Sequence, residues 1–159
     1  MAQNRKAEVL FWSIALPGFG QYLNGKIFKG TVLILLEFVV NVKSGLNHAI
    51  LPSFYGDIHE AISHVNFQWL MFYPCLYLFA MWDAYRDAGG GEAPYAFLPF
   101  VFSAFIGTIG VVYSPIFNIN GIYFGVIFLP IIFLFLGFFI GKGIQVIVRN
   151  WHKRNDATG

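Results

Sequence analysis

Glu37 is the residue of this chain whose type and position most clearly suggest chemistry. It lies in the apolar stretch 31–42, eight residues past Lys29. On a helix that rises about 1.5 Å per residue, this is ~12 Å, near the middle of a ~30 Å hydrocarbon core. A carboxyl group at that depth faces the interior of a helix bundle. Two interpretations stay open: a proton or cation relay, or a hydrogen bond to a neighbouring helix or loop.

Other polar residues accompany Glu37. One helical stripe contains Gly30, Ile34, Glu37 and Asn41. A glycine-rich stretch, residues 16–30, precedes most of this stripe, and its backbone is expected to turn sharply because glycine and proline favour turns. Its candidate residues are Pro17, Gly18, Gly20, Gln21, Asn24, Gly25 and Gly30. A transport route beside a broken helix would be lined by Gln21, Asn24, Glu37 and Asn41.

A second polar group lies in residues 43–66 and contains His48, Asp57, His59, Glu60 and His64. His59 and His64 are five residues apart, whereas two zinc-binding histidines on one helix face are four apart. The sequence also lacks a nucleotide-binding loop, a dinucleotide fingerprint and a catalytic triad. We therefore predict no metal, no cofactor and no catalytic residue. The lone Cys75 is predicted to be a packed thiol.

The composition indicates a membrane protein. Hydrophobic residues make up 57% of the 159 residues and charged residues 11%, against about 45–50% and about 25% in soluble proteins. The net charge of +2 argues against nucleic acid as a partner and leaves the lipid bilayer as the expected surroundings. A spanning helix needs ~20 apolar residues, and several stretches approach that length.

The elements that must position the polar residues are helices. We predict an all-α, polytopic integral membrane bundle, forming a single membrane domain over residues 1–159. Its four spanning helices are expected at residues 27–42, 67–82, 95–113 and 121–141, with a kink at Pro74. The short apolar segment 7–23 is interrupted by Pro17. It either re-enters on the same face or forms a short broken span, which would make five spans.

The segments between and after these spans are polar. In the outer segment 43–66, Asp57 and Glu60 have the spacing of a capping box, and a short amphipathic helix follows them. Residues 142–159 form a basic cytoplasmic tail, whose residues 142–154 are expected to extend the last helix. Trp151 and the basic residues around it suit an anionic membrane surface.

The distribution of positive charge predicts the orientation. With four spans and a re-entrant start, Lys43 alone lies outside, and the other nine basic residues lie inside: Arg5, Lys6, Lys26, Lys29, Arg86, Lys142, Arg149, Lys153 and Arg154. With five spans the count becomes seven against three. Because basic residues favour the cytoplasmic side, we predict four spans and two cytoplasmic termini.

Three pairs of small residues predict close helix packing. They are Ser103 with Gly107, Gly121 with Gly125, and Gly137 with Gly141. Twelve residues from Gly125 to Gly137 turn a helix by about 120°, so these two glycine pairs are expected to face different neighbours. The neighbours are either helices of the same chain or those of a second copy.

A resemblance to a known family rests on four motifs: Pro17-Gly18-x-Gly20-Gln21, Tyr22-Leu23-Asn24-Gly25, Lys29-Gly30 and Trp82-Asp83-Ala84-Tyr85. With a hydrophobic helix between them, they resemble the two-transmembrane ("TM-two") domain and related small bacterial membrane proteins. The resemblance covers residues 7–88, with an insertion at 43–66, and leaves 95–141 as an additional helix pair. The arginine-containing loop motif of eukaryotic members is absent. The resemblance implies a bacterial inner-membrane protein and carries over no catalytic residue, although it adds Asp83 to the candidates.

The predicted function is that of a non-enzymatic scaffold or accessory subunit, which binds another membrane protein or a second copy of itself. The first alternative is a small transporter or channel that uses Glu37. The second is a lipid-active or metal-dependent membrane enzyme that uses the outer histidines and carboxylates.

Overall fold

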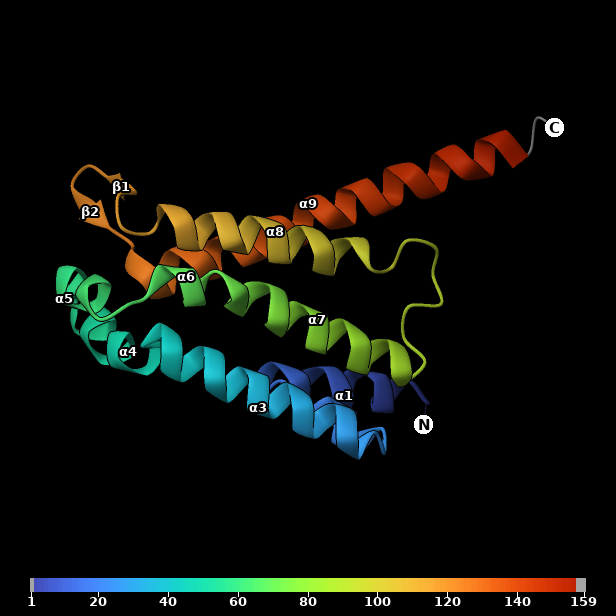
Figure 1. Cartoon of the computed structure of the whole chain (residues 1–159). Helices are drawn as coiled ribbons and strands as arrows, with labels where there is room; N and C mark the ends of the chain where they lie inside the picture. Colours follow the sequence, from blue (N-terminus) through green and yellow to red (C-terminus); the bar gives the residue numbers. More distant parts are fainter. Residues whose placement is uncertain (1, 157–159) are drawn as a thin grey trace.

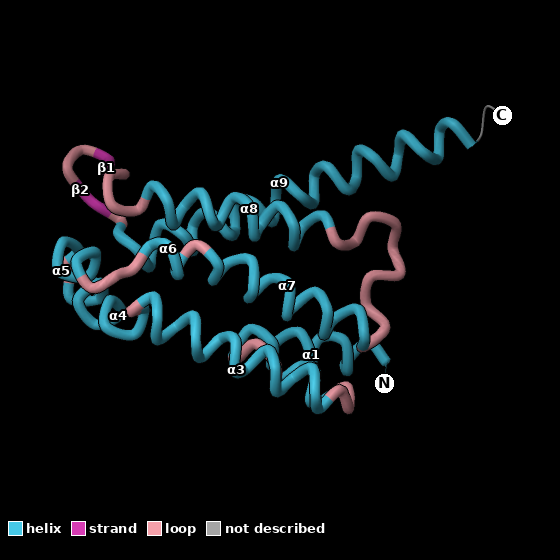
Figure 2. Tube along the Cα trace, in the orientation of Figure 1, coloured by secondary structure: helices cyan, strands magenta, loops and turns pink. Residues whose placement is uncertain are grey.

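The computed structural model describes residues 2–156, and the predicted all-α class is confirmed for this range. Figures 1 and 2 show the order of the elements. They are α1 (Ala2–Ala15), α2 (Phe19–Leu23), α3 (Ile27–Ser44), α4 (Leu46–Tyr55), α5 (Ile58–Ser63), α6 (Phe67–Leu70), α7 (Phe72–Asp87), α8 (Leu98–Tyr113), β1 (Asn118–Ile119), β2 (Ile122–Tyr123) and α9 (Gly125–Asp156).

The long helices run lengthwise, and most of the connections between them gather at two ends (Figure 1). The first, called the hairpin end, holds α4, α5 and the β1–β2 hairpin. The second, called the terminal end, holds the start of α1, the start of α3 and the connection from α7 to α8. The end of α9 also lies toward the terminal end, where this helix extends beyond the rest of the bundle.

The N-terminal segment folds as a helical hairpin. α1 ends at Ala15, Gly18 adopts a positive φ of 106°, and the short α2 turns back. The guanidinium of Arg5 donates a hydrogen bond to the Leu23 carbonyl at 3.4 Å, so the chain returns to the level at which α1 began. The segment thus forms a helix, a turn and a short returning helix.

The helix predicted after Asp57 is confirmed as α5, but the predicted capping box is wrong. The side chain of Asp57 makes no capping hydrogen bond. The reason is the backbone of Asp57, whose ψ of 62° lies outside the extended conformation that directs an N-cap side chain toward the first turn.

The segment expected as one span at residues 67–82 is two helices. Pro74 lies in the first turn of α7, and the break falls at Met71, between α6 and α7. Proline has no N–H, so it cannot donate to the carbonyl of Leu70, four residues earlier. The predicted irregularity is therefore present, displaced toward the N-terminus.

The last two predicted spans begin later than expected. α8 starts at Leu98, and residues 118–123 form the β-hairpin in place of the first turn of a helix. Asn120 and Gly121 both have positive φ, 53° and 85°. Asn-Gly between apolar residues is the typical signal for such a turn. α9 then continues without interruption to Asp156, which confirms the helical extension.

One cluster of buried apolar residues lies toward the hairpin end. Its residues come from α4, α5, α6, α8 and α9: Ala49, Ala61, Leu70, Val111 and Val126. Among the described residues, one helical stretch, Gly125–Asn155, is both long and apolar enough to cross a membrane. The other helices expected to span fall short of this: α3 has 18 residues and three charged side chains, and α7 and α8 have 16 residues each.

Candidate functional site

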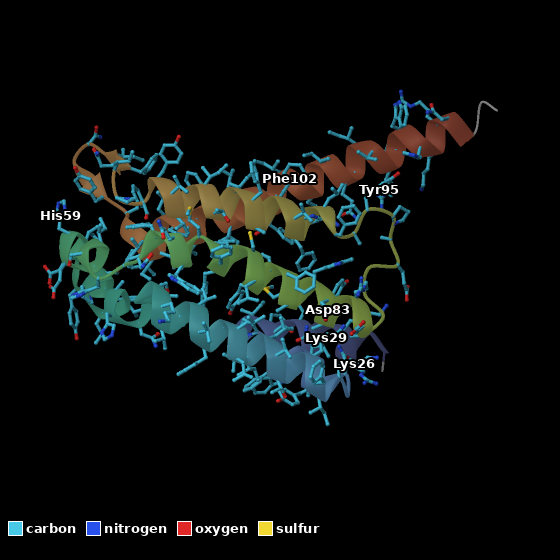
Figure 3. All side chains as sticks on the ribbon, viewed as in Figure 1. Lys26, Lys29, His59, Asp83, Tyr95 and Phe102 are labelled. Atoms are coloured by element: carbon cyan, nitrogen blue, oxygen red, sulfur yellow. The ribbon has the colours of Figure 1, made fainter. Side chains whose placement is uncertain are left out.

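The best-connected polar site is centred on Asp83, near the C-terminal end of α7. The residue is 3% exposed. Its carboxylate accepts hydrogen bonds from Lys29 Nζ at 2.9 Å, Gln21 Nε2 at 3.1 Å and Arg86 Nη2 at 3.3 Å. Figure 3 shows Lys29 beside Asp83 at the terminal end. Together with Asn24 and Asp87, these residues are called the Asp83 cluster.

Charge balance explains why Asp83 is stable when buried. Lys29 also donates to Asp87 at 3.1 Å, so two carboxylates face two cations, Lys29 and Arg86. A buried carboxylate is tolerated when its partners are charged and well placed.

Two amides attach the glycine-rich stretch to α7. Gln21, which is fully buried, donates to the Ala80 carbonyl at 2.9 Å as well as to Asp83. Asn24 donates to the Ala84 carbonyl at 2.8 Å. Among the described residues, the amide oxygens of Gln21 and Asn24 accept no hydrogen bond, although both are buried. The interaction therefore uses the donors of both amides and leaves their acceptors unpaired.

Glycines allow the stretch to approach its neighbours. A Cβ at Gly18 would lie 2.6 Å from the Gly30 carbonyl oxygen, and one at Gly30 would lie 2.8 Å from that of Gly18. A Cβ at Gly20 would lie 2.7 Å from the Cβ of Ala84. Pro17 is buried within the same turn. Gly25 has open space around it and a φ of 73°, so its role is to complete the turn.

Glu37 belongs to a separate polar contact. Its carboxylate accepts a hydrogen bond from the Tyr73 hydroxyl of α7 at 3.1 Å and one from Asn41, one turn along α3, at 3.5 Å. A bond to a neighbouring helix is one of the two interpretations of Glu37. The four residues expected to line a transport route are thus divided between this contact and the Asp83 cluster.

Most of the predicted small-residue pairs form the interface between α8 and α9. A Cβ at Gly137 would lie 2.5 Å from the Phe102 carbonyl oxygen, and one at Gly141 would lie 2.6 Å from that of Leu98. Gly107 faces Leu134, whose carbonyl accepts a 2.7 Å hydrogen bond from Ser103. This set is called the α8–α9 seam.

The Gly121–Gly125 pair does not behave as predicted. Gly121 lies in the β-hairpin turn and has open space around its Cα, so the prediction that it packs helices is wrong. Gly125 begins α9 and faces Ile58 of α5. The expectation of two different neighbours therefore holds for Gly125 and Gly137.

His59 lies apart from His48 and His64. The ring of His59 packs on Tyr123 at 5.1 Å between centroids, whereas His48 faces His64 at 6.2 Å. His64 also approaches Glu60 at 3.7 Å. Within residues 2–156, no three histidine, cysteine, aspartate or glutamate side chains gather in a way that could hold a metal ion.

Sequence reasoning missed three partners in these sites. Lys29 was expected at a membrane boundary and is the main cation on Asp83. Tyr73 was not singled out, although it binds Glu37. Gly110 also lies in the α8–α9 seam, against Pro130 and Phe133. One signal could have predicted the contact between Lys29 and Asp83. The two residues carry opposite charges, and they lie in the last two of the family-like motifs.

Comparisons with models of protein families, with curated proteins and with solved structures gave no match to this chain. The resemblance to the two-transmembrane family accordingly stays a prediction from the motifs.

Proposed function

We propose that this chain is a multi-pass integral membrane protein of the bacterial inner membrane, and that it acts as a non-enzymatic scaffold or accessory subunit of a membrane complex. One observation carries the proposal. Large apolar side chains cover the outer faces of the helices, while the buried polar side chains bond to one another or to backbone groups, as Gln21, Asp83 and Ser103 do. Surfaces of this kind are built to contact lipid and other membrane proteins.

The apolar outer face is broad. Large side chains on four helices expose more than half of their surface: Leu35 and Phe38 on α3, Phe79 on α7, Phe105 on α8, Phe135 and Phe139 on α9. Soluble monomers rarely expose continuous apolar patches beyond a few hundred Å². Contact of these side chains with lipid chains costs no free energy, whereas their exposure to water does.

The proposed spans are α3, α6 together with α7, α8, and α9. At about 1.5 Å per residue, the 16 residues of α8 reach ~24 Å, less than a ~30 Å hydrocarbon core. Local thinning of the bilayer and extension of basic side chains to the interface accommodate such short helices. The α1–α2 hairpin is proposed to enter and leave at the terminal end.

Charge supports placing the terminal end in the cytoplasm. Nine of the ten lysine and arginine residues belong to segments at that end or to the projecting part of α9, and Lys43 lies near the hairpin end. This asymmetry is the pattern of cytoplasmic loops. Both termini are then cytoplasmic.

A non-transport role is favoured because the polar residues are already used. Gln21 and Asn24 donate to the backbone of α7, and Glu37 accepts from Tyr73. These contacts attach helices to one another and form no continuous polar path. The small residues of the α8–α9 seam likewise pack against helices of the same chain. A partner or a second copy is therefore expected to bind elsewhere on the apolar faces.

The first experiment tests the topology. Reporters for cytoplasmic and external location are fused to each terminus in living cells, and membranes are extracted with carbonate. We expect both reporters to indicate the cytoplasm and the protein to stay in the pellet. Reporters on opposite sides, or release by carbonate, would contradict the proposal.

The second experiment separates a scaffold from a transporter. Purified wild type and Glu37→Ala are reconstituted in liposomes, and the flux of protons and small cations is measured. We expect the two to match protein-free liposomes. A flux that Glu37→Ala abolishes would replace the scaffold with a channel. If no flux is found, cross-linking in native membranes followed by mass spectrometry should identify the neighbouring protein that a scaffold requires.

A further inference from the structure

A cavity of about 350 Å³ lies at the terminal end, apart from the Asp83 cluster. Its walls come from α1, the end of α7, the connection 88–97, the start of α8 and the middle of α9. Binding pockets for small molecules occupy about 300–1,000 Å³, so this one has room for a headgroup and the first part of a lipid chain. Its lining separates into a basic part and an apolar part.

Two helices give the cavity the same polarity. On α1, Lys6 and Leu10 are one turn apart and face it together, with the lysine nearer the terminal end. On α9, Lys142 and Phe138 are also one turn apart, again with the lysine nearer that end. The cavity is therefore basic toward the terminal end and apolar toward the middle of the bundle.

Aromatic rings and a buried amide fix the wall. Phe100 packs between Trp82 and Phe138, at 5.4 and 6.5 Å between ring centroids. Gln145, only 4% exposed, donates to the Pro94 carbonyl at 3.1 Å and accepts from Lys142 at 3.0 Å. These contacts hold the connection 88–97 against α9 and position Lys142 at the rim.

Two glycine N–H groups of the connection are already paired within the chain. The N–H of Gly89 donates to the Arg86 carbonyl at 2.9 Å, and that of Gly90 donates to Tyr85 at 2.8 Å. A backbone nest for a free phosphate needs such groups unpaired. An anion in this cavity would be attracted by the two lysines, and the apolar wall would favour an anion with an apolar group attached to it.

We propose that this cavity binds the phosphate headgroup of an anionic phospholipid, with Lys6 and Lys142 on the phosphate and the acyl chain against Leu10, Phe100 and Phe138. The lipid enters from the leaflet next to the terminal end. This inference rests on the proposed membrane location and adds a specific lipid site to the proposed function.

The negative charge of Glu92 opposes the binding of a phosphate in the cavity. Its carboxylate lies 3.3 Å from Lys6 Nζ, and its side chain is 80% exposed. A surface ion pair of this kind is weak, so a phosphate can take its place. Removing the carboxylate should strengthen lipid binding, which is the opposite of the effect of removing either lysine.

Native mass spectrometry of the detergent-solubilised full chain tests the site. Phosphatidylglycerol is titrated against wild type, Lys6→Gln, Lys142→Gln, the double variant and Glu92→Gln. We expect affinity to fall about fivefold for each lysine and about thirtyfold for both, and to rise for Glu92→Gln. Lys26→Gln is the matched control, because Lys26 is exposed at the same end and does not line the cavity.

Two further arms identify the ligand. Phosphatidylcholine should bind more weakly than phosphatidylglycerol, and inorganic phosphate at matched concentration should not displace the lipid. Equal binding of both lipids, an effect of Lys26→Gln equal to that of the cavity lysines, or displacement by inorganic phosphate would each overturn the inference. Carbonate extraction of the same variants keeps the two proposals distinct, since a protein that stays in the membrane without lipid preference refutes only this one.

Discussion

Each half of the molecule is held together by a different kind of contact. In the first half, residues 2–88, a turn is attached to α7 through hydrogen bonds and ion pairs that converge on Asp83. In the second half, α8 and α9 approach through the small residues of their seam, where carbonyl oxygens of α8 leave no room for a Cβ on Gly137 or Gly141.

This difference teaches what each half should tolerate. A hydrogen-bonded cluster depends on charge and donor chemistry, so it should be sensitive to isosteric changes that alter charge. A close seam depends on volume and should be sensitive to a single added group.

The largest effect is expected for Asp83→Asn. The change keeps the shape and leaves Asp87 as the one carboxylate of the cluster, with Lys29 and Arg86 as its two cations. Removing one partner of a buried pair costs about 3–5 kcal/mol, and we expect about 2–3 here because Lys29 is partly exposed. Thermal unfolding in detergent should shift down by roughly 5–10 °C. Glu92→Gln, an exposed carboxylate, is the control, and an equal shift for both would refute the role of the cluster.

The next effect is expected for Gly137→Leu in the seam. Its new side chain would meet the Phe102 carbonyl, and overpacking of this kind costs about 1–3 kcal/mol. Gly143→Leu provides a control on the same helix, because nothing lies within 4 Å of the position its Cβ would take. Thermal unfolding should separate the two variants. If Gly137→Leu is as stable as Gly143→Leu, close approach does not hold α8 to α9.

A smaller effect is expected for Lys29→Gln. The change removes the main cation on Asp83, but Arg86 stays beside that carboxylate. Because Lys29 is partly exposed, we expect a loss of about 1–2 kcal/mol, less than for Asp83→Asn. Thermal unfolding in detergent measures the loss, and Lys26→Gln controls for the general effect of removing a positive charge. A melting temperature equal to that of Lys26→Gln would contradict the role of the ion pair.

The smallest effect is expected at Glu37. Glu37→Gln keeps an acceptor for the Tyr73 hydroxyl, so stability should change little, whereas Tyr73→Phe should cost about 1 kcal/mol because it removes the donor. Chemical or thermal unfolding of the two variants gives the comparison. A larger loss for Glu37→Gln than for Tyr73→Phe would show that the charge of Glu37, and not its hydrogen bond, matters to the fold.

Periodicity and composition predicted most of the helices, because apolar residues at helical spacing depend on local sequence alone. They did not predict the break at Met71, since the missing bond of Pro74 acts four residues before the proline. They also misplaced Gly121: its spacing with Gly125 suggested a helix, while Asn120-Gly121 between two isoleucines carried the hairpin signal.

The candidate site was predicted in parts. Gln21, Asn24 and Asp83 were singled out through the family-like motifs, yet no local pattern shows that Gln21 and Asp83 touch across 62 residues of sequence. Such a contact depends on how α2 and α7 pack. The α8–α9 seam was easier, because small residues four apart mark a helix face before the partner is known.

The unequal lengths of α8 and α9 have a practical consequence. With 16 and 32 residues at about 1.5 Å each, α9 outreaches its partner by roughly 24 Å. A spin label or fluorophore at Asn150, which is exposed on that overhang, would ride on a rigid rod anchored by the seam. The orientation of this label would report the tilt of the α8–α9 pair, and no probe would have to be placed among the packed side chains.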